Sequence, residues 1–181
     1  MLRKILAGIA IILVILAAVI AMQPSEFKIS RSITIEASAS DVFQEVIDFH
    51  RWPNWSPWAR LDPAMKTEFT GTPGVDGSSH GWSGNSAVGE GRMTLIKSIA
   101  PSLILIKLDF TRPMKATNIT QFSFESQGAA TAVTWTMSGN NNFIAKAFHL
   151  VMSMDKMVGP DFEHGLAKLK DIAEKKTPAA Q

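Results

Sequence analysis

An uncharged apolar stretch at the N-terminus places the strongest constraint on how this chain folds. Residues Ile5 to Met22 contain no charged or strongly polar side chain, and Arg3 and Lys4 come directly before them. As an α-helix with a rise of about 1.5 Å per residue, the stretch is about 27 Å long, close to the thickness of a bilayer's hydrocarbon core. We therefore expect residues 1–22 to form a transmembrane anchor, with a cleaved signal peptide or a buried soluble helix as the alternatives.

The position of the basic residues predicts the orientation of this anchor. Positive side chains before a spanning helix favour a cytoplasmic N-terminus, so we expect the domain to be extracytoplasmic, in the periplasm or on the outer face of the inner membrane. Arg3 and Lys4 account for the whole net charge of +2, because no acidic residue precedes Glu26. The remaining domain is neutral and lacks the basic surplus of nucleic-acid binders, so we expect no nucleic-acid partner.

The residue types available limit the chemistry of the domain. The chain has no cysteine, which excludes thiolate zinc sites, iron–sulfur clusters and a cysteine nucleophile. Its histidines form neither an HExxH pattern nor a pair spaced i, i+4. We therefore expect no metal site and no cofactor.

Hydrophobic periodicity predicts one α+β domain. Residues 23–26 are expected to be a linker, 27–175 the domain and 176–181 a tail. Alternation over 27–36 predicts a half-buried strand, followed by a helix that Ser38 or Ser40 caps and Pro53 ends. Further strand-like runs cover about residues 66–70, 79–83, 88–99, 103–111, 116–125 and 131–138.

The period changes to helical spacing between Ile144 and Ile172. Gly159 and Pro160 interrupt this pattern. We therefore expect either a short helix followed by a long one, or one long helix kinked near Pro160.

Several segments of the domain carry a family resemblance: RSITIEAS, SDVFQEVIDF, RWPNWSPWARLDP, GWSGNSAVGEGRM and MVGPDFEHGLAKLKDIAE. Together they resemble the START-like, helix-grip superfamily, in its bacterial SRPBCC group of polyketide cyclases/dehydrases and lipid-transport proteins. The resemblance covers about residues 27–175. It implies a curved antiparallel sheet of six or seven strands wrapped around a long C-terminal helix, with a hydrophobic cavity between them. Members include lipid carriers, hormone binders and cyclases, so the fold alone does not assign the function.

Large apolar side chains are expected to face the space between the sheet and the final helix, where they either line a ligand cavity or fill the core. These candidate ligand-binding residues are Trp82, Met93, Phe110, Phe122, Phe124, Trp135, Met137, Phe148, Met152 and Phe162. Trp52, Trp55 and Trp58 are spaced three residues apart. This cluster suits a cavity mouth or a membrane contact, and the alternative is a packed loop at the base of the sheet.

Three polar residues are candidates for proton transfer. Arg31 falls on the apolar face of the first predicted strand, either as a charge inside the cavity or as a paired structural arginine. His80 and Asp109 are the other candidates for a general acid or base. We expect none of them to be catalytic, because no known catalytic arrangement is present in the sequence.

The leading hypothesis is a membrane-anchored, extracytoplasmic protein that binds a hydrophobic small molecule or lipid in a helix-grip cavity. An enzyme of the cyclase or dehydratase type, which would use an inward polar residue, is the first alternative. The second alternative is a protein-interaction module with a filled core, whose working surface is the tryptophan segment.

Overall fold

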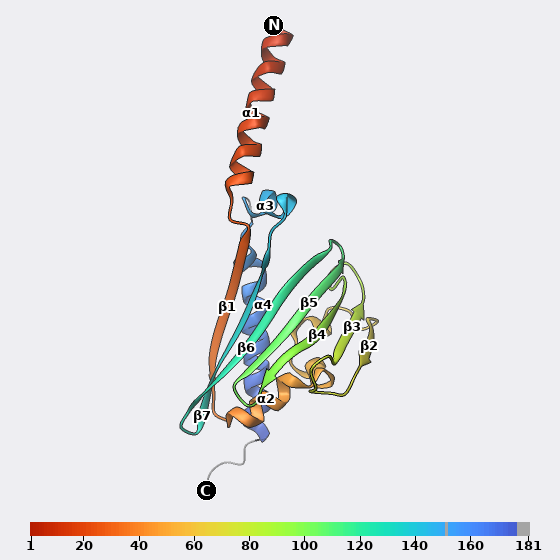
Figure 1. Ribbon diagram of the computed structural model, residues 1–181, viewed down its shortest axis with the longest axis vertical. Helices are drawn as coiled ribbons and strands as arrows, with labels where there is room; N and C mark the ends of the chain where they lie inside the picture. The colour runs from red at the N-terminus through yellow and green to blue at the C-terminus, as the bar shows by residue number, and fades with distance from the viewer. Residues whose placement is uncertain (151, 177–181) are drawn as a thin grey trace.

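The computed structural model describes residues 1–150 and 152–176 and contains one isolated helix followed by an α+β domain (Figure 1). Helix α1 (Leu2–Met22) has 21 residues, and by length and composition it could cross a membrane. It projects away from the domain and packs against little of it (Figure 1). Of the predicted tail, residues 176–181, Lys176 is the last residue of the final helix, and residues 177–181 lie outside the described residues.

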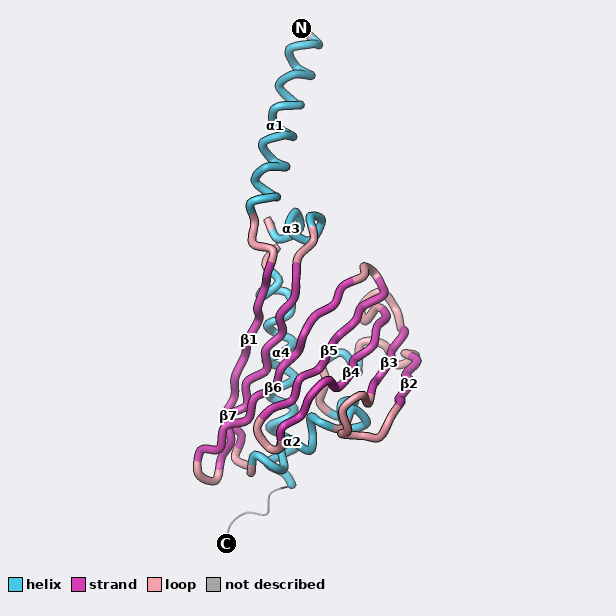
Figure 2. The backbone as a smooth tube through the Cα atoms, viewed as in Figure 1, coloured by secondary structure: helices cyan, strands magenta, loops and turns pink. Residues whose placement is uncertain are grey.

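Within the described residues, seven antiparallel strands form one sheet in the order β1-β7-β6-β5-β4-β3-β2. The sheet curves from β1 round to β2 (Figure 2). The strands are β1 (Glu26–Ile35), β2 (Lys66–Thr70), β3 (Ser79–Ser83), β4 (Glu90–Ile99), β5 (Leu103–Arg112), β6 (Ala116–Gln127) and β7 (Ala130–Asn140). The α+β class and the sheet of six or seven strands are confirmed.

The segment after β1 begins as predicted but ends earlier. Helix α2 (Ala39–Ile47) is capped by Ser38, whose hydroxyl oxygen accepts a hydrogen bond from the backbone N–H of Asp41. The prediction that Pro53 ends this helix is wrong, since α2 ends at Ile47. The carboxylate of Asp48 accepts the backbone N–H of His50 and thereby starts a separate 3₁₀ helix, η1 (Phe49–Asn54), followed by η2 (Pro57–Arg60).

The C-terminal segment forms a short helix followed by a long one. These are α3 (Phe143–His149) and α4 (Met154–Lys176), so the first of the two predicted layouts is confirmed. The predicted position of the break is wrong, because α4 continues through Gly159 and Pro160. A proline near the start of a helix removes one backbone donor, and here the packing of α4 on the sheet outweighs that loss.

The packing of α4 on the sheet centres on Trp135 of β7. Its ring stacks on Phe162 of α4 with ring centroids 4.0 Å apart and on Phe122 of β6 with centroids 4.9 Å apart. Gly165 lies one helical turn from Phe162, where a Cβ would come within 2.8 Å of the Trp135 ring and 3.2 Å of Pro57. The close approach of α4 therefore requires glycine at position 165.

Arg31 joins β1 to the start of α4. Its guanidinium nitrogens bind the carboxylates of Asp155, at 2.8 Å, and Glu163, at 2.6 Å. The side chain crosses α4 at Gly159, where a Cβ would collide with the guanidinium. The hydrogen bond from Arg31 holds the pKa of Asp155 below its usual value. Of the two readings of Arg31, the structure has the paired structural arginine.

Gly165→Ala tests this packing by the sign of its effect. Alanine favours a helix by about 1 kcal/mol over glycine, so helix propensity alone predicts a more stable protein. We expect the opposite, a loss of about 1–3 kcal/mol, because the new methyl group overpacks the space beside Trp135. Urea unfolding of the full chain in detergent, monitored by tryptophan fluorescence, measures the difference in free energy of unfolding between the two proteins. A stability gain in Gly165→Ala would contradict the packing described here.

Candidate functional site

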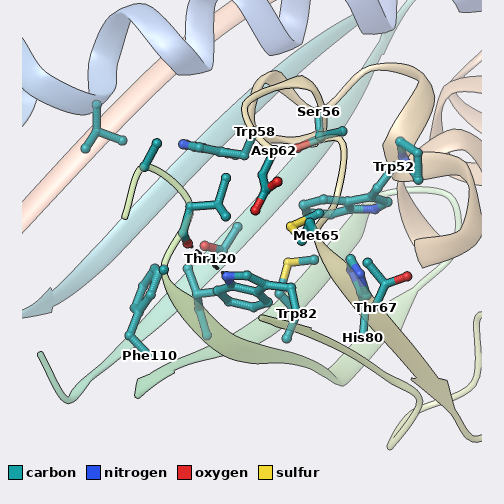
Figure 3. A pocket seen from close by; sticks show the side chains of 18 of the residues that line it. Trp52, Ser56, Trp58, Asp62, Met65, Thr67, His80, Trp82, Phe110 and Thr120 are labelled. Atoms are coloured by element: carbon teal, nitrogen blue, oxygen red, sulfur yellow. Dashed lines mark hydrogen bonds between the residues drawn. The ribbon is translucent and has the colours of Figure 1, made fainter. Parts of the chain in front are cut away.

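A cavity of about 460 Å³ lies between the sheet, α4 and the η1–η2 segment. Trp58 and Asp62 face Trp82 and Phe110 of the sheet across it (Figure 3). Most of its wall is apolar, contributed by tryptophan, phenylalanine, methionine and aliphatic side chains. Such a cavity favours an apolar ligand, with a few polar groups to orient it.

The structure brings many of the sequence-predicted residues together around this cavity. Those that line it are Trp52, Trp58, His80, Trp82, Met93, Phe110, Trp135, Met137 and Phe162. Phe122 and Phe124 lie instead in the closed core, where Phe124 packs edge-on against Phe43 of α2. Phe122 packs against Trp52, Trp55 and Trp135, so these rings fill the space beside the cavity.

The prediction that Phe148 and Met152 face the interior is wrong. Their side chains are 66% and 50% exposed, respectively. The reason is that α3 is a separate helix from α4. It lies past the end of the sheet at which β7 finishes, so both residues are outside the space between the sheet and α4 (Figure 1). Helical spacing alone does not distinguish this arrangement from one continuous core-facing helix.

The tryptophan cluster is mostly wall and core rather than a mouth. Trp52 and Trp55 are buried, and their indole N–H groups donate to the backbone carbonyls of Val46 and Glu45, respectively. Trp52 and Trp58 line the cavity, whereas Trp55 lies behind it in the core. The prediction of a mouth formed by all three is therefore corrected, since these hydrogen bonds turn Trp52 and Trp55 inward.

Two of the three proton-transfer candidates lie outside the cavity. Arg31 is held by Asp155 and Glu163, as described above. The carboxylate of Asp109 pairs with Lys107 at 2.9 Å and accepts a hydrogen bond from Thr117 at 2.7 Å. Both residues thus have structural partners. Those of Arg31 come from α4, whereas Asp109 pairs with Lys107 of its own strand and with Thr117 of β6.

His80 is the proton-transfer candidate that lines the cavity (Figure 3). It is 7% exposed and stacks on Phe69 with ring centroids 4.6 Å apart. Both ring nitrogens are buried and have no hydrogen-bond partner among the described residues. Burial lowers the pKa of His80 to about 4, and the charges of His50 and Arg92 act in the same direction. The imidazole is therefore neutral at physiological pH.

The exposed rim is formed by loops that periodicity could not identify. The carboxylate of Asp62 accepts the backbone N–H of Asn85 at 2.7 Å, and the Asn85 side chain donates to the carbonyl of Leu61. These bonds join the loop before β2 to the loop between β3 and β4. Arg112, also at the rim, pairs with Glu90 at 3.0 Å.

Three deeper lining residues were missed although the sequence held a signal for them. Leu108 and Thr120 lie two positions before Phe110 and Phe122 on the same strand faces. Val158 lies four positions before Phe162 on one face of α4. Extending the strand and helix periods by one step finds all three. Among the described residues, no group of three or more histidine, aspartate and glutamate side chains could hold a metal ion.

The lowered pKa of His80 predicts a specific acid sensitivity. The unfolded chain binds a proton at this histidine near pH 6.5, whereas the folded protein does so only near pH 4. Stability from this group is therefore fully present above pH 6.5 and is lost as the pH falls towards 4. His80→Phe should show a smaller drop in urea midpoint between pH 7 and pH 4.5 than the natural chain. An equal drop would contradict this assignment, and His164→Gln, which changes an exposed histidine, is the control.

The fold of the domain matches solved structures at low sequence identity. The solution structure of the Aha1 dimer from Colwellia psychrerythraea is 20% identical, with a TM-score of 0.59, covering 82% of this chain and 96% of that one. Major latex-like protein 151 from Panax ginseng is 14% identical, with a TM-score of 0.57 and coverage of 83% and 99%. Protein MLL2253 from Mesorhizobium loti is 10% identical, with a TM-score of 0.62 and coverage of 83% and 99%. These similarities show the START-like, helix-grip fold.

A search of curated protein sequences finds no match to this chain. The family model described as polyketide cyclase / dehydrase and lipid transport matches residues 26–174, which include the whole sheet and nearly all of α4. The chain therefore belongs to the polyketide cyclase / dehydrase and lipid transport family.

Proposed function

We propose that this protein binds a hydrophobic small molecule or lipid in the helix-grip cavity and is held on a membrane by α1. The observation that carries the proposal is the cavity itself, which is about 460 Å³ in volume and walled largely by apolar side chains. A volume of this size suits small-molecule ligands. The family's description includes lipid transport, which supports an apolar ligand.

The composition of the cavity wall supports binding by shape and apolar contact. Met65, Met93 and Met137 contribute flexible thioether side chains that adapt to ligands of different outline. Trp58 and Trp82 are only partly buried and present aromatic faces to the cavity. The charged groups of the rim, Asp62 and Arg112, already have partners in the protein. The ligand therefore gains most of its binding free energy from apolar surface removed from water.

A cyclase- or dehydratase-like enzyme is the second candidate, and His80 is the observation that favours it. A general base must come within hydrogen-bond distance of the proton that it removes. Both nitrogens of His80 are buried from solvent. Catalysis at this residue would thus require the ring to turn, so binding is the better supported function.

The third hypothesis, an interaction module with a filled core, is the least supported. The cavity is open space beside the core rather than packed side chains. The proposed working surface also fails, because Trp52 and Trp55 are buried.

A matched pair of variants on α4 tests ligand binding. Val158 and Ile172 are both half-buried apolar residues that pack against the core, but only Val158 lines the cavity. Val158→Phe should weaken ligand binding about tenfold or more, equivalent to about 1.4 kcal/mol of binding free energy, by occupying cavity space, and should lower ligand occupancy as a result. Ile172→Phe should leave occupancy unchanged. The measurement is native mass spectrometry of the full chain, with organic extraction of bound molecules.

The full chain is purified in detergent, and detergent or lipid can attach to α1 as well as enter the cavity. The difference between the two variants separates a molecule bound in the cavity from one bound elsewhere. A molecule that accompanies the natural chain and Ile172→Phe, but is lost from folded Val158→Phe, is the ligand of the cavity. Equal occupancy in all three proteins, or no bound molecule in any of them, would contradict the proposal.

We also propose that α1 remains attached and leaves the domain on the extracytoplasmic side. The supporting observations are the length of α1 and the position of Arg3 and Lys4 before its apolar core.

Cysteine labelling tests this orientation. In intact cells with a permeabilised outer membrane, a membrane-impermeant maleimide should label Ile99→Cys and spare Leu2→Cys. The reverse pattern would contradict the orientation, and a mass lacking residues 1–22 would contradict the uncleaved anchor.

A further inference from the structure

Helix α3 exposes its large apolar side chains, which a helix on the surface of a water-soluble protein normally buries. Phe143, Ile144 and Phe148 are 54%, 57% and 66% exposed, respectively. The residues between them, 145–147, are half-buried. A helix on the surface of a soluble protein normally buries its large apolar residues and exposes the others. Leu150 and Met152 extend the exposed apolar surface beyond α3.

The position of α3 indicates what covers this surface. It lies beside the C-terminal end of α1 (Figure 1), and the ammonium group of Lys146 lies 3.4 Å from the backbone carbonyl of Ala21. If α1 spans a bilayer, Ala21 and Met22 lie at the boundary between lipid and water. The contact with Ala21 then places α3 at the same depth.

The antiparallel register places the cavity rim at this end of the sheet too. The end at which β1 begins is the end at which β7 and β5 finish and β4 begins. The rim residues Ala87 and Pro113 lie in turns at that end, and Arg112 is the last residue of β5 there. Ile99 is the last residue of β4, at the other end of the sheet, nine residues from Glu90 and thus about 30 Å away at about 3.3 Å per residue.

We infer that the exposed face of α3, with Leu150 and Met152, is a membrane-interface contact that seats the domain on the bilayer spanned by α1, with the cavity rim turned towards the lipid. An amphipathic helix of this kind lies in the plane of the interface with its apolar side among the acyl chains. The inference rests on the proposed membrane anchoring by α1. It adds a second contact with the same bilayer and a defined orientation of the cavity.

The absence of cysteine from the chain permits a direct test. The full chain is reconstituted in vesicles of phosphatidylethanolamine and phosphatidylglycerol, with one environment-sensitive fluorophore at a time attached at a single introduced cysteine. The positions are Ile12→Cys in α1, Phe148→Cys in α3, Ala87→Cys at the rim, and Ile99→Cys. Ile99 is an exposed apolar residue, like Phe148, and serves as the matched control.

Quenchers attached to lipid acyl chains should strongly reduce the fluorescence at Ile12→Cys and Phe148→Cys and leave Ile99→Cys unchanged. Energy transfer to a headgroup dye should be more efficient from Ala87→Cys than from Ile99→Cys. Aqueous iodide should quench Ile99→Cys several times more strongly than Phe148→Cys.

Different failures identify different errors. Lipid quenching at Ile12→Cys without quenching at Phe148→Cys would overturn the α3 contact while leaving the anchor in place. No quenching at Ile12→Cys would overturn the anchor itself and this inference with it. Disulfide-linked dimers of unlabelled Phe148→Cys, together with no lipid quenching of the labelled protein, would overturn the α3 contact and show that a second copy covers α3. Equal energy transfer from Ala87→Cys and Ile99→Cys would overturn the orientation of the rim.

Discussion

The contact between α4 and Trp135 determines both the core and the cavity of this domain. The Trp135 ring is held between Phe162 on the helix and Phe122 on the sheet, so one side chain sets the distance between the two layers. Gly165 permits that distance because it places no Cβ against the ring. On one side of this stack the layers close into core beneath α2. On the other side they separate, and the space between them is the cavity.

The electrostatics of the domain fit an uncharged interior. Arg31 and Arg112 pair with carboxylates of neighbouring elements, and Asp109 pairs with Lys107 of its own strand, so none is directed as a free charge into the cavity. At the far end, the buried carboxylate of Glu45 binds both Arg51 and Lys176 at 2.7 Å and thereby ties the end of α4 to α2. A buried carboxylate requires such partners. The charged side chains named here hold elements of the fold together. The wall of the cavity is mostly apolar and includes the neutral side chain of His80.

The features on which the proposed membrane contacts and ligand site depend lie at one end of the molecule. Helix α1, the exposed face of α3 and the cavity rim all lie at the end where β1 begins. The opposite end carries α2 and the C-terminal end of α4. The proposed anchor, the proposed interface contact and the proposed ligand site therefore lie at the same end. In this arrangement a ligand would enter the cavity from the side of the bilayer.

Local patterns in the sequence determined the elements of this protein. Alternation of apolar and polar residues identified β1, a serine before an apolar helical face identified the cap of α2, and uncharged length identified α1, because each signal depends only on neighbouring residues. The tertiary structure decided which surface each side chain meets. Arg31 binds carboxylates that lie more than a hundred positions away in the sequence, in α4. Phe148 lies outside the core because α3 is a separate helix from α4. The tertiary structure also decided the cavity, because a space between layers depends on how the layers pack. The loops at its rim show no hydrophobic periodicity from which their position could be predicted.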